Sequence, residues 1–241
     1  MKQLKVLIAC EESQRVCIEF RKLGHEAYSA DIQEPSGGHP EWHIHGDCLK
    51  ILHGGGFSTM NGELHSVDKW DLIIAHPPCT YLSKAGACRL YKVIDGKTYI
   101  ERERFEKGLD AKEFFLQFLD NTDCEHIAVE NPIPSAVYRL PEYTQTIQPY
   151  EYGHPYSKKT ALWLRGLPKL KPSKLLSSYK PYVSCNTSIN KGNKDKAGVS
   201  RAGGAAKVRS KTFQGIARAM AQQWSDYLTG KTDKQLSFFE E

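Results

Sequence analysis

The sequence predicts an α/β fold with a mostly parallel sheet, and three observations lead to this prediction. Continuous apolar runs of strand length at 4–9, 71–75 and 127–130 are typical of strands buried on both faces. Amphipathic stretches of helical length lie between or after these runs. The chain also opens with strand, turn, helix and strand, which is the first unit of a nucleotide- or nucleoside-binding fold.

Composition is that of an ordinary globular protein. The chain has 241 residues, of which 40% are hydrophobic and 25% charged, and its net charge is +5. We expect a single domain over residues 1–228 and a flexible tail at 229–241. The seven cysteines are scattered and form no CxxC pair, which argues against a disulfide framework and favours a reducing cytoplasm. No run resembles a signal peptide or a membrane span, so we expect no membrane partner.

The opening unit contains a candidate ligand site. We expect Ser13 to cap a helix that ends at Gly24, and a second strand over 25–31 to finish on Asp31. That acid follows the first turn by about 20 residues, where it can accept hydrogen bonds from ribose hydroxyls. The first turn, 10–14, has no glycine and holds two glutamates that would repel phosphates. A phosphate-free cationic cofactor such as S-adenosylmethionine fits it; the alternative is that the glutamates only favour the helix dipole.

Residues 32–69 are rich in Gly, His and Pro, and we expect them to be mostly loop. Asp47 is placed at the end of a short third strand within them. Histidines at 39, 43, 45 and 53 raise the question of a metal ion, but the partners at fixed spacing that zinc needs are missing. We therefore predict no metal site.

The stretch from Trp70 to Ser83 brings a cysteine to the end of a buried strand. Two prolines stop the apolar run and place Cys79 directly behind them in a stiff loop. Ligands bind at the carboxyl ends of strands in open α/β sheets, so this thiol is a candidate for chemistry. The alternative is a small buried apolar residue, which is the more usual role of a cysteine.

A linker and a long helix are expected after the Cys79 loop. The linker contains Tyr91 and Tyr99, and the helix runs over about 104–119. Several phenylalanines and Leu109 favour one side of this helix. That side should cover the sheet.

A second strand end carries a carboxylate. The run 127–130 delivers Glu130 to its end, and Pro132 stops it. Together with Cys79 this makes a chemically sensible pair. A thiolate can add to C6 of a pyrimidine while a carboxylic acid protonates N3, which makes C5 nucleophilic toward a methyl sulfonium.

The last third of the chain is expected to hold a hairpin, a basic segment and a helix. The hairpin is formed by 144–152 and 159–164. Residues 171–210 are rich in Lys, Ser, Asn and Gly, and we expect them to be flexible and attractive to nucleic acid. The final helix, 212–228, should pack on the sheet through its apolar face.

Short stretches in this order resemble the DNA cytosine-5 methyltransferases, in particular the short phage and prophage proteins. They are SAD at Asp31, GD at Asp47, HPPCT around Cys79 and ENP at Glu130. The resemblance implies a Rossmann-like S-adenosylmethionine-dependent methyltransferase fold, with a mostly parallel sheet and an antiparallel terminal hairpin. It implies methyl transfer from S-adenosylmethionine to C5 of cytosine through a covalent Cys79 adduct. Double-stranded DNA would be the partner, in a bacterial or phage-infected cytoplasm.

The resemblance also implies three groups of site residues. The catalytic pair would be Cys79 and Glu130. The cofactor-binding residues would be Cys10, Glu11, Ser13, Asp31, Ile32, Asp47, Cys48, His76 and Pro77. The substrate-binding residues would be Pro78, Thr80, Asn131, Lys158, Lys159 and Arg165.

The sequence departs from the family pattern at three places. The glycine-containing cofactor loop is replaced by ACEESQ at 9–14, and lysines stand at 158 and 159 where arginines are expected. Only the segment 171–210 is available for target recognition. It can supply phosphate contacts more easily than base contacts, so a short or relaxed sequence preference is expected.

Two other functions remain open. Amino-methylation of adenine (N6) or cytosine (N4) usually places Asn, Asp or Ser before Pro-Pro and an aromatic residue after it, whereas this chain has His76 and Cys79 there. The other alternative is a catalytically silent DNA- or clamp-binding module.

The tail resembles a peptide that binds the replicative sliding clamp. Its matching residues are Gln235, Leu236, Phe238 and Phe239. A glutamine and an apolar cluster on a mobile tail can fill a polar and an apolar pocket of a partner. The alternative is an apolar terminus without a partner.

Overall fold

The structure is a computed structural model that describes residues 2–87, 89–182 and 210–231. Its main sheet has seven strands in the order β10-β12-β9-β6-β1-β2-β3. Their bounds are β1 Lys5–Ala9, β2 Glu26–Asp31, β3 His43–His45, β6 Leu72–Ala75, β9 Ile127–Pro132, β10 Gln145–Ile147 and β12 Thr160–Arg165. Strands β3, β2, β1, β6 and β9 pair in parallel, whereas β12 is antiparallel to both β9 and β10. The predicted fold class, a mostly parallel α/β sheet with an antiparallel terminal hairpin, is confirmed.

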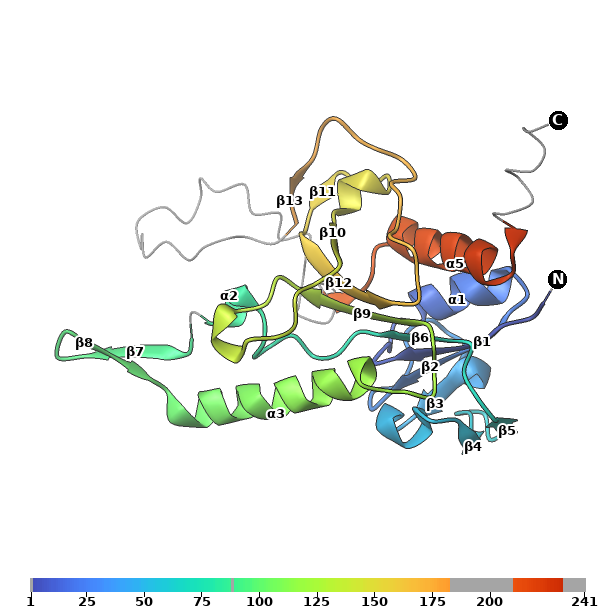
Figure 1. The fold of residues 1–241 in the computed structure, drawn as a ribbon, viewed down its shortest axis with the longest axis horizontal. Coiled ribbons are helices and arrows are strands. Elements are labelled where there is room, and N and C mark those ends of the chain that lie inside the picture. The colour runs from blue at the N-terminus through green and yellow to red at the C-terminus, as the bar shows by residue number, and fades with distance from the viewer. Residues whose placement is uncertain (1, 88, 183–209, 232–241) are drawn as a thin grey trace.

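Helices cover both faces of this sheet (Figure 1). Helices α1 (Arg15–Lys22) and α5 (Gln214–Leu228) lie together on one face, and α3 (Arg102–Leu119) lies on the other. Successive residues of a strand point to opposite faces, so alternate residues of β1 join different cores. Val6 and Ile8 pack with α1 and α5, while Leu7 and Ala9 join the α3 side. The apolar runs in the sequence arise from this burial on both faces.

The start of α1 corrects the prediction for Ser13. The residue before the helix is Gln14, which has a left-handed φ of 56° and makes no side-chain cap. The Glu11 carboxylate takes that role and accepts hydrogen bonds from the amides of Val16 (2.7 Å) and Cys17 (3.2 Å). Because Glu11 lies further back in a tight turn, its longer side chain reaches amides that the Ser13 hydroxyl does not.

The segment expected as loop after β2 contains more structure than predicted. Strand β3 lies in it, and a second hairpin is formed by β4 (Gly55–Ser58) and β5 (Leu64–Val67). Two short 3₁₀ helices are present, η1 at Pro40–Trp42 and η2 at Cys48–Ile51. Asp47 follows β3 by two residues and caps η2, as its place near the end of a third strand predicted.

The segment between the Cys79 loop and α3 differs most from its prediction, which was a linker. It folds into a helical turn, α2 (Lys84–Ala87), and a hairpin of β7 (Tyr91–Ile94) and β8 (Lys97–Ile100). This hairpin, called the ribbon below, extends away from the body (Figure 1). Helix α3 is confirmed, and Phe115 and Phe118 of its predicted apolar side are buried, whereas Leu109 is 40% exposed.

Shorter elements complete the carboxyl-terminal part of the described chain. They are η3 (Ala136–Tyr138), η4 (Pro149–Glu151), β11 (Tyr156–Ser157) and β13 (Lys180–Pro181). Most of the basic segment 171–210, and the clamp-like residues 235–239, lie outside the described residues. Within the described ranges no helix is long and apolar enough to cross a membrane.

Candidate active site

The Cys79 loop is fixed to the residues that follow Glu130. The Asn131 side-chain amide donates to the Pro77 carbonyl at 3.0 Å, on one side of Cys79. On the other side, the Ser135 amide donates to the Leu82 carbonyl at 2.8 Å. Because β6 and β9 are neighbouring parallel strands, both segments leave the sheet at its carboxyl edge. The structure therefore brings the half-buried Cys79 loop and the Glu130 segment together, as the sequence predicted.

A buried ion pair lies at the base of this loop. The Nδ1 atom of His76 is 3.1 Å from Oε2 of Glu130, and the side chains are only 9% and 15% exposed. Burial favours the uncharged form of each group, yet the pKa of Glu130 lies below its usual value because the hydrogen bond and charge of His76 outweigh burial. In the same way, burial opposes but does not cancel the effect of Glu130 and Glu11, which raises the pKa of His76. The pair therefore holds one proton between a carboxylate and an imidazole.

Two buried polar atoms at this edge have no hydrogen-bond partner within the described residues. They are Nε2 of His76 and Oδ1 of Asn131. An unpaired buried polar atom costs about 1–3 kcal/mol, so such atoms are uncommon unless a ligand or water satisfies them. Both belong to residues that contact the Cys79 loop or Glu130, which makes this edge a candidate ligand-binding position.

The turn after β1 suits a ligand without phosphates. Glu11 is 3% exposed and occupies the amino-terminal amides of α1, which are the groups that would otherwise bind an anion. Burial, the main influence, raises the pKa of this carboxyl. Ser13 is also buried, and its backbone packs against Gly37. This turn is therefore closed to a pyrophosphate.

Acidic residues lie at the ends of β2 and β3. The Asp31 carboxylate is half-buried and accepts a hydrogen bond from the Gln33 amide at 2.9 Å. Asp47 caps η2 by accepting the Leu49 amide at 3.0 Å. The side chain of Ile32, next to Asp31, is 75% exposed. An exposed apolar side chain beside carboxylates can cover one face of a nucleoside while the acids bind its hydroxyls.

Cys10 and Cys48 lie side by side next to these acids. Their sulfur atoms are 3.7 Å apart, and Cys10 has a left-handed φ of 58° at the end of β1. The hydrogen bond to Cys48, followed by burial, raises the pKa of Cys10 well above its usual value. Cys10 is thus a thiol at neutral pH, and both cysteines line this edge as small polarisable side chains.

Several other residues predicted to bind cofactor or substrate belong to the loop or act on the ion pair at its base. Pro77 is buried and Pro78 is exposed. The carbonyl of Thr80 accepts a hydrogen bond from the Arg104 guanidinium of α3 at 3.1 Å. This contact between α3 and the loop was not predicted from the sequence. Lys158 is half-buried and its charge acts on both members of the ion pair, whereas Lys159 is exposed.

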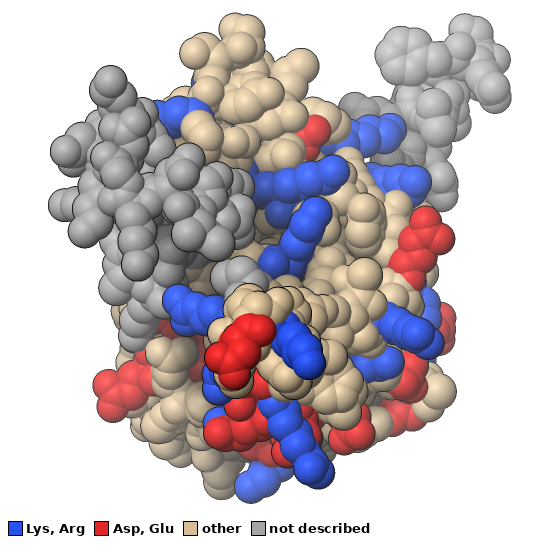
Figure 2. Space-filling view, turned by 90° about the vertical axis from the view of Figure 1, so that its left-hand side faces the viewer, with Lys and Arg blue, Asp and Glu red and all other residues tan. Residues whose placement is uncertain are grey.

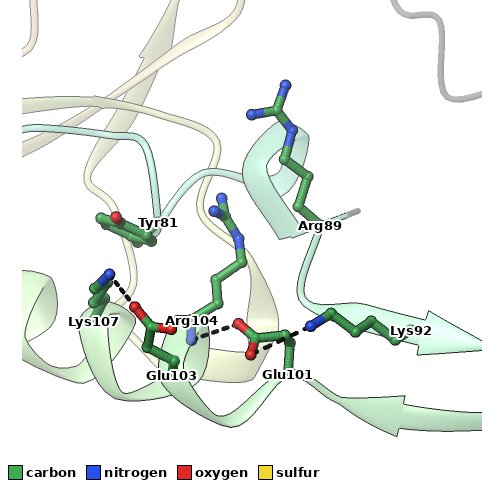
Figure 3. Close-up of a pocket in the computed structure, with 7 residues that line it drawn as sticks. All are labelled: Tyr81, Arg89, Lys92, Glu101, Glu103, Arg104 and Lys107. Atoms are coloured by element: carbon green, nitrogen blue, oxygen red, sulfur yellow. Dashed lines mark hydrogen bonds and ion pairs between the residues drawn. The ribbon is translucent and has the colours of Figure 1, made fainter.

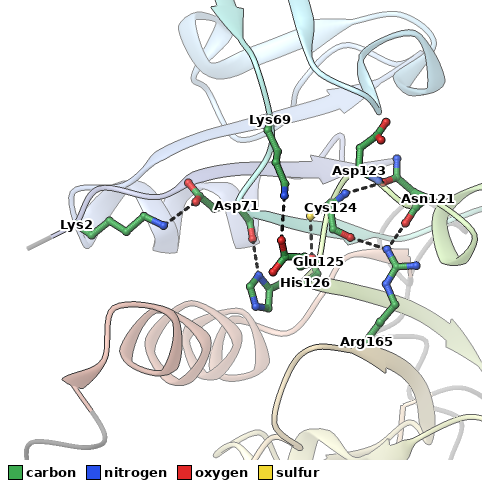
Figure 4. A network of polar contacts seen from close by, with 9 residues as sticks. All are labelled: Lys2, Lys69, Asp71, Asn121, Asp123, Cys124, Glu125, His126 and Arg165. Atoms are coloured by element: carbon green, nitrogen blue, oxygen red, sulfur yellow. Dashed lines mark hydrogen bonds and ion pairs between the residues drawn. The ribbon is translucent and has the colours of Figure 1, made fainter.

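The structure does not bring Arg165 to this site. It pairs with Ile127 at the start of β9, at the opposite edge of the sheet. There its guanidinium donates to the carbonyls of Asn121 and Cys124 (Figure 4), and also to that of Leu119. Because β12 runs antiparallel to β9, its last residue lies at the amino edge of the parallel strands. The prediction that Arg165 binds substrate is therefore wrong, and the residue instead holds backbone groups of the fold.

An open pocket of about 260 Å³ lies between α3 and the base of the ribbon (Figure 3). Its lining consists of Tyr81, Arg89, Lys92, Glu101, Glu103, Arg104 and Lys107. This group of residues was not predicted from the sequence, because part of it lies on the ribbon and the ribbon was predicted as a linker. Among the described residues, no set of three or more His, Cys, Asp or Glu side chains is arranged to hold a metal ion.

Comparison with known proteins found solved structures only. No family model matches the chain, and no curated protein does. One similar structure is described as a DNA modification methyltransferase encoded within a prophage (E. coli), with 11% identity and a TM-score of 0.37 over 67% of this chain and 46% of that one. Another is the S. pombe Dnmt2 methyltransferase, with 16% identity and a TM-score of 0.35 over 68% and 49%.

A third similar structure is the Entamoeba histolytica methyltransferase EhMeth. It shows 13% identity and a TM-score of 0.37 over 78% of this chain and 62% of that one. The chain thus spans less than two thirds of each of these proteins. A likeness this distant carries no argument about activity, which rests below on the residues of the chain itself.

Proposed function

We propose that this protein is an S-adenosylmethionine-dependent DNA methyltransferase that modifies C5 of cytosine through Cys79. One observation carries the proposal: a proline-stiffened cysteine loop is hydrogen-bonded to the segment of a buried Glu130–His76 pair at the carboxyl edge of a mostly parallel sheet. Nucleophile and acid are thereby supplied from neighbouring strands. The sequence resemblance to cytosine-5 methyltransferases points to the same pair.

The residues along β1, β2 and β3 fit S-adenosylmethionine. Its sulfonium and amino groups are cationic, and this end of the sheet presents carboxylates while Glu11 closes the phosphate position. Asp31 would hold the ribose hydroxyls, and Ile32 would cover the adenine with Asp47 near it. When bound, the cofactor supplies an electrophilic methyl group. Cys10, Cys48 and Pro77 would line the remaining wall.

Cys79 and the ion pair then have distinct tasks. The Cys79 sulfur, as thiolate, forms a bond to C6 of the cytosine ring, and the electron pair of the C5–C6 double bond moves toward N3. A proton must reach N3 for this addition to be favourable. Glu130 can deliver it because His76 holds a proton 3.1 Å from the carboxylate. The resulting adduct has a nucleophilic C5.

Product release reverses the first addition. After C5 has gained the methyl group, its original proton passes to water, the C5–C6 double bond reforms and the Cys79 sulfur leaves as a thiolate. The proton on N3 returns to the Glu130–His76 pair, so that atoms and charge balance over the cycle. Since none of this can occur within a base stack, the cytosine must first be flipped out of the duplex.

Amino-methylation is the second candidate, and it is less consistent with the site. That chemistry needs a polar acceptor before Pro-Pro to hold the exocyclic amine and an aromatic ring after it. Here His76 is already paired with Glu130 and Cys79 replaces the aromatic residue. The geometry thus favours attack at a ring carbon.

The test compares two cysteine substitutions. In Cys79→Ser, transfer of a labelled methyl group to duplex DNA should fall to background, and a duplex containing 5-fluorocytosine should no longer form a covalent complex. In the control Cys124→Ser, at the opposite edge, both signals should persist. Transfer that survives in Cys79→Ser would exclude the covalent mechanism. A wild-type protein that binds no S-adenosylmethionine by calorimetry would support a silent DNA-binding module instead.

We further propose that the tail residues Gln235, Leu236, Phe238 and Phe239 bind the replicative sliding clamp. The support is the sequence pattern alone. Deletion of residues 235–241 should abolish co-elution with the clamp and leave methyl transfer on short duplexes unchanged. Co-elution that persists after the deletion would contradict this proposal.

A further inference from the structure

The ribbon formed by β7 and β8 is exposed along its whole length. All eight of its strand residues are exposed, including Val93 at 70% and Ile94 at 55%. A two-stranded hairpin on its own is at most marginally stable in water, and contiguous exposed apolar residues usually mark a binding surface. The base is held to the body because the Glu101 amide donates to the carbonyl of buried Leu90 at 2.8 Å.

The two faces of the ribbon differ in chemistry. Cross-strand pairs place Tyr91 opposite Ile100 and Val93 opposite Thr98, which makes one face largely apolar. The other face carries the pairs Lys92–Tyr99 and Ile94–Lys97, in which each lysine lies beside an apolar or aromatic side chain. Lysines interleaved with rings and aliphatic groups can contact phosphates and base or sugar surfaces together.

Positive charge is concentrated at the base of the ribbon. Figure 2 views the molecule from the ribbon end and shows Lys and Arg side chains across the middle of this face. The pocket between the ribbon and α3 has four cationic and two acidic residues in its lining. Each acid already has a lysine partner, Glu101 with Lys92 and Glu103 with Lys107.

The two pocket arginines therefore carry the excess charge. Arg104 is fixed by the carbonyls of Thr80 and Gly86 and lies over the ring of Tyr81 at 4.9 Å. Arg89 extends away from the other lining residues (Figure 3), and its guanidinium makes no hydrogen bond or ion pair with any residue the structure describes. Such a group is suited to bind a phosphate.

We propose that the ribbon and the pocket at its base form an arm that holds duplex DNA beside the Cys79 loop. The charge of the pocket is complementary to a polyanion, and the major groove of DNA is wide enough for a two-stranded ribbon. Arg104 links the arm to the loop because it contacts the Thr80 carbonyl, one residue after Cys79. The choice of DNA as the occupant rests on the proposed function, whereas the presence of a binding arm rests on the exposure and charge of the ribbon itself.

The arm can be removed without cutting into the body. Leu90 and Glu101 are joined by a hydrogen bond, so residues 91–100 can be replaced by Gly-Gly. A second variant, Arg89→Gln/Lys97→Gln, keeps the ribbon and removes one cationic charge at its base and one on its second strand. The matched control is Lys2→Gln/Lys69→Gln, which removes two exposed lysines from the opposite edge of the sheet.

Binding is measured by fluorescence anisotropy with a labelled duplex between about 50 and 200 mM salt, without methyl donor and in a Cys79→Ser background. We expect the ribbon deletion and the double glutamine variant to bind at least about tenfold more weakly. The slope of log affinity against log salt should flatten by about 2 in the glutamine variant, since each phosphate contact contributes about 0.9. The control should match the parent.

Wild-type DNA affinity in both ribbon variants, or an equal loss of affinity in the control, would contradict the proposal that the arm binds DNA. Circular dichroism and the melting temperature verify that each variant remains folded. Because binding is measured without chemistry, the result is separate from the proposed activity. If the protein needs the ribbon to bind DNA but transfers no methyl group, the arm proposal is supported and the proposed function is contradicted.

Discussion

Two side chains at the amino edge of the sheet, Asp71 and Arg165, hold backbone groups, whereas two at the carboxyl edge, His76 and Asn131, keep polar atoms available. At the amino edge, Asp71 accepts a hydrogen bond from the Lys5 amide at 2.8 Å. Arg165 donates to the carbonyl of Leu119 at the end of α3 and to those of Asn121 and Cys124, the last two of which are seen in Figure 4. At the carboxyl edge, His76 and Asn131 each keep a buried polar atom without a partner among the described residues.

This difference separates residues that stabilise the fold from those that can do chemistry. A polar group whose hydrogen bonds are satisfied within the chain has nothing left for a ligand. One that is buried and unsatisfied costs stability until a ligand arrives, which is expected at functional sites. Substitutions at the amino edge should therefore lower stability, and those at the carboxyl edge should lower activity.

The largest expected effect is at Glu130. In Glu130→Gln, the methyl-transfer rate should fall by about 10²–10⁴, the usual contribution of a general acid. Glu125→Gln makes the same change at an exposed position of the amino edge and should retain the parent rate. Single-turnover transfer of labelled methyl groups measures both. Equal rates for the two variants would show that the edges do not differ as described.

Arg165 should show the opposite behaviour. Arg165→Met leaves the carbonyls of Leu119, Asn121 and Cys124 without their donor, so the free energy of unfolding should fall by about 2–3 kcal/mol. Urea denaturation measures this loss. Arg218→Met, at a largely exposed arginine of α5, should cost less than about 1 kcal/mol. A folded Arg165→Met protein that has lost methyl transfer selectively would restore Arg165 to the site.

His76 should control the pH dependence of the reaction. The raised pKa of His76 keeps a proton in the pair until the pH rises above the usual imidazole value of 6.5. In His76→Gln that proton is held by Glu130 alone, which releases it at lower pH because its usual value is 4.5. The alkaline limb of the rate profile should therefore move to lower pH. An unchanged limb would mean that His76 has only a packing role.

The same pair has a consequence for stability. The Glu130 contribution is lost as pH falls through its lowered pKa, and the His76 contribution is lost as pH rises through its raised pKa. The advantage of the wild type over His76→Gln should thus be largest between about pH 4.5 and 6.5. Thermal unfolding across this range tests it, and an advantage that grows above pH 8 would contradict the ion pair.

The smallest effect is expected for Lys2→Ala. Its ion pair with Asp71 is 2.9 Å long, but the lysine side chain is 63% exposed. Exposed pairs contribute at most about 1 kcal/mol, and Asp71 keeps its bond to the Lys5 amide. Urea denaturation should therefore show little change. A loss as large as that of Arg165→Met would mean that the amino edge depends on surface charge rather than on backbone hydrogen bonds.

The ribbon was not predicted, although the sequence contains a turn signal for it. The Asp95–Gly96 pair has positive φ at both residues, 50° and 72°, which is the two-residue turn that joins antiparallel strands. Asn61–Gly62 marks the β4–β5 hairpin in a similar way. Neither pair is flanked by a continuous apolar run of the length that identified the buried strands. Apolar runs alone therefore do not identify hairpins that lie outside the main sheet.

The sequence by itself determined the main sheet and the edge at which the Cys79 loop and the Glu130 segment both lie. Apolar runs mark strands buried on both faces, and the carboxyl ends of parallel strands lie at one edge whatever connects them. Tertiary structure alone decided which polar residues remain available there. The direction of β12 sends Arg165 to the far edge, and the register of β6 and β9 pairs His76 with Glu130. Direction and register depend on contacts between distant segments, which a local sequence pattern does not encode.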